Sequence, residues 1–187
     1  GKLWPNGAVL RIAFLRGDKS LRDAVKATAV QWVSHANLHF EFVEEISEAS
    51  LRVSFVTGQG SWSYIGTDAR DVADITMNLD PGRSEEEFRN RVLVHFGHAI
   101  GLLKEHQNPN AEIPWDKDAV YKYFTGPPNF WSRAMVEQNL FRKWPENAYP
   151  LEKPYDPKSI MHYAIKNEWT LGDFNVDPST EISEGDK

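Results

Sequence analysis

Three histidines fall within residues 91–109, which read RVLVHFGHAIGLLKEHQNP. His95 and His98 are three positions apart, so they are neighbours on one face of a helix. Gly101 is a typical helix stop, and His106 follows it. Because neutral imidazole is a common ligand of Zn²⁺, a metal centre for hydrolysis is the first hypothesis to test.

A zinc peptidase needs a particular set of groups around its metal. Three histidine or carboxylate side chains hold the ion and leave a fourth position for water. A carboxylate beside that water takes its proton and passes it to the leaving amine. One helix supplies most of this as H-E-x-x-H, and the longer motif H-E-x-x-H-x-x-G-x-x-H adds a third histidine after a glycine. Residues 91–101 contain no glutamate, so the general base of such a site is missing.

Several segments of the chain resemble the astacin family of metzincin zinc peptidases. FGHAIGL is similar to the second half of the family's zinc helix, EHQNP to the segment after it, and SIMHY (residues 159–163) to its methionine turn. Other segments resemble the cysteine-free microbial branch of the family: LWPNG, SWSYIGT, TMNL, IPWDK and YDPKSIMHY. The resemblance spans nearly the whole chain. It implies an α+β fold, with an N-terminal mixed sheet and two helices over an irregular C-terminal lobe and a cleft between them.

Residue by residue, the family's zinc motif transfers only in part. Without a gap, His98 takes the second ligand position and Gly101 the glycine position. Val94 then stands at the first ligand position, His95 at the glutamate position and Lys104 at the third ligand position. A gapped alignment instead pairs His95 with the first histidine, but its deletion rotates the preceding helix by about 100°. We prefer the ungapped alignment, because it leaves the helix at its normal length.

The substituted positions argue against zinc binding. A valine side chain cannot coordinate, and a protonated lysine repels Zn²⁺. The resemblance implies zinc as the cofactor, whereas Val94 and Lys104 put its binding in doubt. His98 and His95 are the remaining candidate ligands, although imidazole at position 95 does not directly replace a carboxylate. A rewired site built from His95, His98 and His106 stays open as an alternative.

Two further residues match the corresponding positions of the family's site. Met161 is expected to form the hydrophobic floor beneath the metal position. Tyr163 matches the family's tyrosine that can bind zinc at rest and then stabilise the tetrahedral oxyanion. A phenol donor suits that task, which makes Tyr163 the candidate catalytic residue.

The resemblance also implies a peptide-binding cleft. The family pairs an extended peptide with an edge strand, and residues 74–79 (DITMNL), with Met77 and Asn78, are our candidate for that strand. Trp62 and Tyr64 lie in a loop rich in glycine and serine and are expected to cap the cleft. We therefore expect a peptide or protein as the partner.

Three functions are compatible with these residues. The first is an inactive astacin-like domain, altered in nature or by design, that keeps its peptide-binding cleft. The second is an active zinc endopeptidase with a rewired metal site. The third is another metal-dependent or hydrolytic activity built on His95 and His98, for which we find no convincing third ligand. We favour the first, because only one of the three family ligands is present.

Hydrophobic patterning predicts the elements that must position these residues. Ser84, with Glu87 three residues later, is a capping box that starts a helix ending at Gly101. Another amphipathic helix is expected in residues 20–38, and a helical patch in 132–144. Strands are expected at residues 8–15, 39–45, 51–56 and 74–79.

Composition limits the organisation and the partners. The 187 residues suit one domain with two lobes, 1–101 ending in the zinc helix and 102–187 carrying the methionine turn. A net charge of −6 without a basic run argues against nucleic acid. No apolar stretch approaches the about 18 residues of a membrane helix, so we expect no membrane insertion. The absence of cysteine excludes disulfides and thiolate ligands. The chain opens without methionine, and we expect a secreted monomer.

Overall fold

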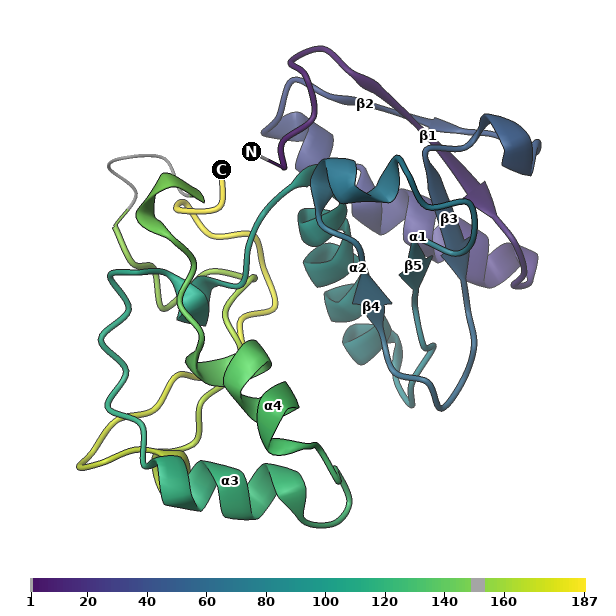
Figure 1. The fold of residues 1–187 in the computed structure, drawn as a ribbon. Helices are drawn as coiled ribbons and strands as arrows, with labels where there is room; N and C mark the ends of the chain where they lie inside the picture. Colours follow the sequence, from purple (N-terminus) through teal and green to yellow (C-terminus); the bar gives the residue numbers. More distant parts are fainter. Residues whose placement is uncertain (1, 149–153) are drawn as a thin grey trace. The chain divides into compact units, whose positions relative to one another are not determined.

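The computed structural model describes residues 2–148 and 154–187 (Figure 1). The chain divides into two compact units, which are Gly1–Leu102 with Lys187, and Leu103–Asp186. The first unit holds a five-stranded mixed sheet and two helices, as the sequence predicts. The second unit is made of short helices and turns.

The sheet of the first unit has the strand order β2-β1-β3-β5-β4. Neighbouring strands are parallel except at one end, where β4 runs antiparallel to β5. The strands are β1 (Val9–Phe14), β2 (His39–Phe42), β3 (Leu51–Ser54), β4 (Trp62–Ser63) and β5 (Met77–Asn78). Parallel neighbours need a crossover connection, and helix α1 (Lys19–Ala29) supplies it between β1 and β2.

Helix α2 (Glu85–Ile100) begins and ends where the sequence predicts. The Ser84 hydroxyl accepts a hydrogen bond from the backbone N–H of Glu87 at 3.2 Å, which satisfies one of the open donors at the helix start. The Glu87 carboxylate accepts from the Arg83 N–H at 3.4 Å, one residue before the usual partner in a capping box. Gly101 ends the helix at φ +118°, a left-handed conformation that glycine adopts at little cost.

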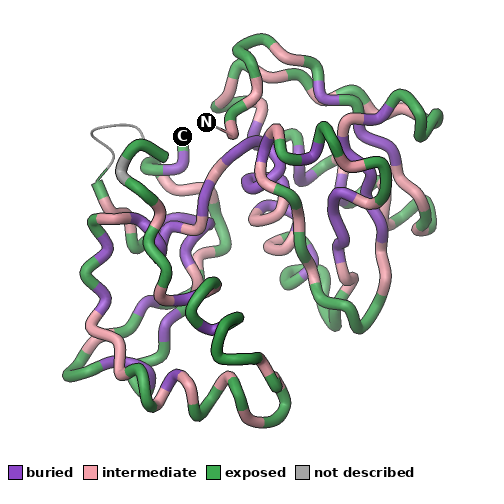
Figure 2. The backbone as a smooth tube through the Cα atoms, viewed as in Figure 1, coloured by how far each residue is buried: buried purple, intermediate pink, exposed green. Residues whose placement is uncertain are grey.

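The core of the first unit lies between the sheet and its helices. Buried residues recur along the strands and along α2 (Figure 2). Ile12 of β1 stands in register with Phe42 on one side and Leu51 on the other, so β1 is central and apolar. The largest fully buried side chains of this unit are Trp32, Phe96, Leu10, Ile12, Leu51, Met77, Leu79, Leu93 and Val25.

Helix α1 is shorter than the helix expected in residues 20–38. It ends at Ala29, and a 3₁₀ turn at Trp32–Ser34 follows. The Trp32 ring is 1% exposed, and its Nε1 donates to the Leu93 carbonyl oxygen at 2.9 Å. Packing of this indole against α2 therefore outweighs the helical pattern of the local sequence.

The free edge of the sheet is not where we expected it. Residues 74–79 contain β5, which pairs with β3 on one side and with β4 on the other. The expectation that this segment forms the edge strand is therefore wrong. The edge strands are β2 and β4. Strand β4 lies within the segment that we expected to be a loop, and a strand of two residues is too short to give an alternation signal.

One α-helix among the described residues of the second unit was not predicted by the sequence patterning. Helix α3 (Lys117–Thr125) starts at Asp116, whose carboxylate accepts a hydrogen bond from Ala119 N at 3.0 Å. The helical patch expected in residues 132–144 corresponds to α4 (Arg133–Val136) and the π-helical segment η5 (Glu137–Phe141). No helix within residues 2–148 or 154–187 is long and apolar enough to cross a membrane.

Two apolar clusters hold the second unit together. The first cluster consists of Ala111, Ile113, Ile165 and Val176. The second consists of Val120, Val136, Leu140 and Trp169, which joins α3, α4 and η5. Tyr163 packs against the second cluster, so this core supports the tyrosine of the candidate site.

Candidate functional site

His98 lies near the C-terminal end of α2 and keeps the form of a metal ligand. Its side chain is buried, and its Nδ1 lies 2.9 Å from the Leu102 carbonyl oxygen. A carbonyl oxygen only accepts, so Nδ1 carries the proton and the lone pair of the ring is on Nε2. A metal-binding histidine commonly has its second nitrogen held by such a carbonyl group.

The other motif positions on α2 differ in chemistry. Val94 lies four residues before His98, which places both residues on one helix face. Its side chain is purely hydrocarbon and offers no lone pair. The rings of His95 and His98 have centroids 6.0 Å apart and are inclined by 49°. A neutral imidazole at position 95 has a single acceptor nitrogen, whereas a carboxylate there offers two oxygens.

Lys104 is held by neighbours within the second unit. Its Nζ donates to Asn139 Oδ1 at 2.7 Å and lies 5.2 Å from the centroid of the Tyr163 ring, a cation–π distance. Burial lowers the pKa of Lys104 to about 8. At pH 7 most of this amine is therefore protonated, and an ammonium has no lone pair for a metal.

His106 is a structural histidine in the neutral form. It is fully buried, its ring stacks on the Tyr163 ring at 4.5 Å between centroids, and its Nε2 donates to the Asn139 carbonyl oxygen at 2.7 Å. Burial lowers the pKa of His106 to about 3, and the positive charges of Lys104 and Lys143 act in the same direction. Its Nδ1 has no hydrogen-bond partner in the described part of the chain.

The methionine turn is fixed by a carboxylate from the end of the second unit. Asp186 accepts hydrogen bonds from the Ser159 hydroxyl at 2.5 Å and from the Ile160 N–H at 2.8 Å. Met161 is 2% exposed, and its carbonyl oxygen accepts from Glu105 N at 3.1 Å. This last bond joins the turn directly to the segment that carries Lys104 and His106, with which Tyr163 is in contact.

His162 serves to orient the turn. Its Nδ1 donates to the Tyr163 carbonyl oxygen at 2.6 Å, and its Nε2 accepts from the Tyr155 hydroxyl at 2.8 Å. Burial raises the pKa of Tyr155 to about 12, with further contributions from nearby carboxylates. Both nitrogens of His162 are thus used within the protein.

The residues at the motif positions do not fit zinc. A zinc site needs three or four nitrogen, sulfur or oxygen donors with available lone pairs. Val94 has no donor atom, Lys104 is mostly protonated, and the Nε2 of His106 donates to a backbone carbonyl. Across residues 2–148 and 154–187, no three histidine, cysteine, aspartate or glutamate side chains gather into a group that could hold a metal ion.

The strand β4 presents backbone groups at the sheet edge. Tyr64 N donates to the Thr76 carbonyl oxygen at 3.0 Å, next to the Ser63–Met77 pair. In an antiparallel pair the N–H groups alternate between the two sides of the strand, so the Ser63 N–H points away from β5. Trp62 and Tyr64 are 37% and 41% exposed and pack edge to face at 6.2 Å.

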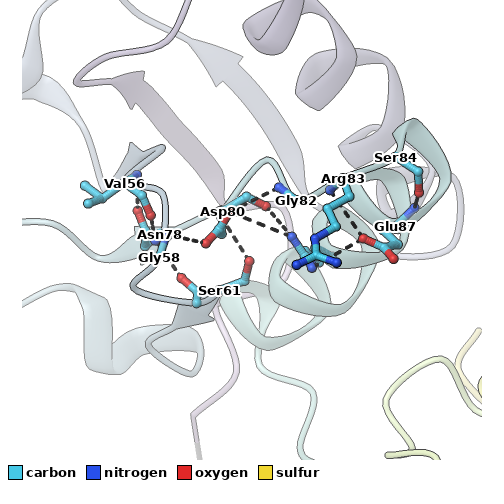
Figure 3. Close-up of polar contacts among 11 residues, drawn as sticks. Val56, Gly58, Ser61, Asn78, Asp80, Gly82, Arg83, Ser84 and Glu87 are labelled. Carbon is cyan, nitrogen blue, oxygen red and sulfur yellow. Dashed lines mark hydrogen bonds and ion pairs between the residues drawn. The ribbon is translucent and has the colours of Figure 1, made fainter. Parts of the chain in front are cut away.

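Met77 and Asn78 are both buried, so their side chains support the edge rather than line it. The Asn78 amide nitrogen donates to the carbonyl oxygens of Val56 at 3.1 Å and Gly60 at 2.6 Å (Figure 3). Its amide oxygen accepts from Val56 N at 2.8 Å. Asn78 therefore fixes the loop that leads into β4.

Asp80 fixes the same loop from its other end (Figure 3). Its carboxylate accepts from the N–H groups of Gly58 at 2.7 Å and Gly82 at 3.0 Å, and its own N–H donates to the Ser61 hydroxyl at 3.0 Å. Hydrogen bonds from Gly82 and Gly58, together with the charge of Arg91, hold the pKa of Asp80 below its ordinary value. The loop before β4 is thus held by a carboxylate that is ionised at neutral pH.

Two residues of this arrangement are absent from the sequence-based interpretation. Asn139 binds Lys104 through its side chain and His106 through its backbone, from a segment more than 30 residues away. Ser63 carries the outward N–H of the edge strand. A local sequence motif signals neither role.

Comparisons with known proteins identify related sequences. The family model for Astacin, a peptidase family, matches residues 1–171. Bone morphogenetic protein 1 of Xenopus laevis is 26% identical over 174 residues, which is 92% of this chain and 22% of that protein. Tolloid-like protein 1 of Homo sapiens is also 26% identical over 174 residues, or 15% of its length. The chain spans about a fifth or less of these curated relatives.

Solved structures match the fold. A structure of myroilysin is 40% identical and has a TM-score of 0.92, covering 99% of this chain and 91% of that one. High choriolytic enzyme 1, a hatching enzyme zinc-protease from Oryzias latipes, has a TM-score of 0.68 at 16% identity and shares the fold over 99% of this chain and 88% of that one. These matches confirm the predicted α+β fold.

The buried neutral state of His106 predicts an acid-sensitive stability. Unfolding restores an ordinary histidine pKa near 6.5, so the unfolded chain binds more protons between about pH 3 and pH 6.5. This contribution to stability is complete above pH 6.5 and decreases as the pH falls. From pH 7 to pH 5 it decreases by about 2 kcal/mol. Urea unfolding at both pH values should show this loss in the wild type and a smaller one in His106→Gln.

The matched control is His39→Gln, which changes an exposed histidine in β2. It should retain the wild-type pH dependence. Equal losses of stability in the wild type and His106→Gln would show that His106 is not held in its neutral form.

Proposed function

The chain belongs to the astacin family of metallopeptidases, and we propose that it has lost zinc binding and catalysis and that it binds peptides instead. The observation that carries the proposal is the chemistry of the motif positions. Val94 and Lys104 stand where the family's first and third ligands are expected; Val94 has no donor atom, and Lys104 is mostly protonated at pH 7. The same conclusion applies whether the substitutions arose in nature or by design.

Loss of the general base supports an inactive site independently of the metal. Hydrolysis requires a group that takes a proton from water and returns it to the leaving amine. His95 stands at the glutamate position, and Tyr163 is the only family catalytic group that our alignment retains beside the ligand His98. Burial raises the pKa of Tyr163, so its phenol is neutral and acts as a donor, not as a base.

Peptide binding does not depend on the lost groups. An extended peptide can add to an exposed sheet edge through main-chain hydrogen bonds. The outward N–H of Ser63 on β4 supplies such a donor, and the rings of Trp62 and Tyr64 supply apolar surface beside it. Asn78 and Asp80 hold the preceding loop, which keeps the edge in a conformation suited to pairing.

An active zinc endopeptidase with a rewired site is the alternative. It would use His95 and His98 with His106 as a third ligand. That role would require breaking the bond from His106 Nε2 to Asn139 and exposing a fully buried ring. A third possibility, another activity on His95 and His98 alone, lacks a further ligand in the described residues. We therefore favour the peptide-binding function.

That the protein is a monomer and that it is secreted remain two predictions from the sequence. Size-exclusion chromatography with light scattering tests the first property, and fractionation of a producing culture tests the second. The partner is proposed to be a peptide or an unstructured protein segment, since the family is one of peptidases.

Blocking the outward N–H of β4 should abolish peptide pairing. Proline lacks that group, and it is tolerated on edge strands, so Ser63→Pro should fold and bind an extended peptide at least about tenfold more weakly. Ser63→Ala keeps the N–H and is the matched control, with binding close to wild type. Fluorescence anisotropy of a labelled casein-derived peptide, with chelator present, measures both. Unchanged affinity in a folded Ser63→Pro variant would exclude β4 as the binding edge.

Restoring the family's zinc ligands and general base should restore zinc binding. The triple variant Val94→His, His95→Glu and Lys104→His regains three ligands and the general base in our ungapped alignment. Elemental analysis and calorimetric titration should then give about one zinc per chain. The single variant Val94→His is the control and should bind much more weakly. A folded triple variant that binds no zinc would show that the ungapped alignment is wrong.

A further inference from the structure

The first unit contains a cavity of about 420 Å³ at the carboxyl ends of β1 and β2. Phe14, the last residue of β1, lines it together with Val43 and Glu44, which follow the end of β2. Because the two strands are parallel, their ends meet at one edge of the sheet, where open parallel sheets commonly bind ligands. The volume lies in the range of about 300–1,000 Å³ that is typical of small-molecule sites.

Helix α1 places cations on the wall of this cavity. Lys19, Arg22 and Lys26 line it and are three and four residues apart, so they share one face of the helix. Residues four apart on a helix have Cβ atoms about 5–6 Å from each other. Arg22 and Lys26 are therefore both within reach of one small ligand in the cavity.

The Arg22 guanidinium is oriented by the turn before α1. Its Nε donates to the Gly17 carbonyl oxygen at 3.0 Å. Gly17 has φ +93°, and a Cβ there would lie 2.6 Å from the Phe55 ring, so this turn requires glycine. The two terminal nitrogens of Arg22 have no hydrogen-bond or ion-pair partner in residues 2–148 and 154–187. Four N–H groups of a planar fork are thus left for solvent or a ligand.

The Lys26 ammonium is held over two phenyl rings. Its Nζ lies 5.4 Å from the centroid of the Phe42 ring and 5.9 Å from that of Phe14, which are cation–π distances. The two rings stack on each other at 5.8 Å between centroids. In the part of the chain that the structure describes, no carboxylate lies within ion-pair distance of this ammonium and no acceptor within hydrogen-bond distance. Its N–H groups are therefore also left for solvent or a ligand.

Two carboxylates also line the cavity. Asp23 forms an ion pair with Lys19, so these two charges compensate each other. Glu44 is exposed and has no ion-pair partner among the described residues. Arg22 and Lys26 thus supply two cations against the single charge of Glu44. The cavity favours an anion, and Glu44 opposes it.

We propose that this cavity binds a phosphate monoester, with the phosphate between Arg22 and Lys26. The guanidinium fork binds two phosphate oxygens, and the ammonium binds the third. A monoester offers three terminal oxygens and a charge of about −1.5 to −2 at pH 7, which matches two cations, whereas a carboxylate offers two oxygens and one charge. Phe14 and Val43 provide apolar surface for the organic group.

This site is separate from main-chain pairing along β4 and independent of the proposed loss of zinc. Strands β1 and β2 lie at one end of the strand order, and β4 lies at the other end. The Ser63→Pro variant should therefore bind a phosphate monoester as the wild type does. Failure of peptide pairing and failure of the phosphate site are separately observable.

Three probes test the site and identify the source of the phosphate: phenyl phosphate, phenyl sulfate and inorganic phosphate. Calorimetry at low ionic strength measures affinity, because salt screens exposed charges. Phenyl phosphate should bind about fivefold or more tightly than phenyl sulfate, which carries one charge, and than inorganic phosphate, which lacks the organic group. Backbone amide NMR shifts upon binding should centre on Phe14, Gly17 and Arg22.

Variants then assign the binding to the two cations. Arg22→Gln and Lys26→Met should each weaken phenyl phosphate binding about tenfold, the effect of one charge-assisted hydrogen bond. Arg22→Lys keeps the charge without the fork and should show a smaller loss. Glu44→Gln should bind severalfold more tightly, because it removes the opposing charge. Arg83→Gln, at an exposed arginine of the same unit, is the control for net charge and should bind as the wild type.

Several outcomes would overturn the phosphate site. In the wild type, they are the absence of saturable phenyl phosphate binding, or an affinity for it no higher than for phenyl sulfate or inorganic phosphate. In folded variants, they are unchanged binding by Arg22→Gln or Lys26→Met, or no gain in Glu44→Gln.

Discussion

Zinc is held by lone pairs, and in the ungapped alignment two of the family's three ligand positions fall on a valine and on a lysine that is mostly protonated at neutral pH. Val94 ends in methyl groups, and Lys104 ends in an ammonium fixed by Asn139 and the Tyr163 ring. His98 retains the tautomer of a ligand, but one imidazole does not hold the ion. The proposed loss of catalysis follows from this constraint, because the ungapped alignment leaves neither a full set of ligands nor a glutamate as the general base.

Each of the two units is held together by contacts among its own residues. Helix α2 is closed by Ser84 at its start and by Gly101 at its end, and its inner face packs into the core of the first unit. In the second unit, Asp186 secures the methionine turn, and the neutral ring of His106 stacks on Tyr163. Local capping and apolar burial therefore stabilise each unit.

The sequence predicted the parts of the protein that local chemistry specifies. The bounds of α2 follow from a cap and a glycine, and the central strands follow from runs of branched residues. The astacin fold follows from motifs spread along the chain, and the matches to known proteins confirm it. The edge strand β4 was not predicted, because two residues are too few to show the alternation of apolar and polar side chains that is typical of a strand. The role of Asn139 escaped it because the contact with Lys104 joins residues far apart in sequence.

The central claim is that the native chain does not bind zinc and does not cleave peptides. Its most direct test is elemental analysis of the protein purified without chelator and then exposed to excess zinc, paired with an assay for cleavage of casein. The account predicts zinc well below one equivalent per chain and no cleavage above background. One equivalent of zinc together with cleavage that a chelator abolishes would contradict the account and establish a rewired, active metal site.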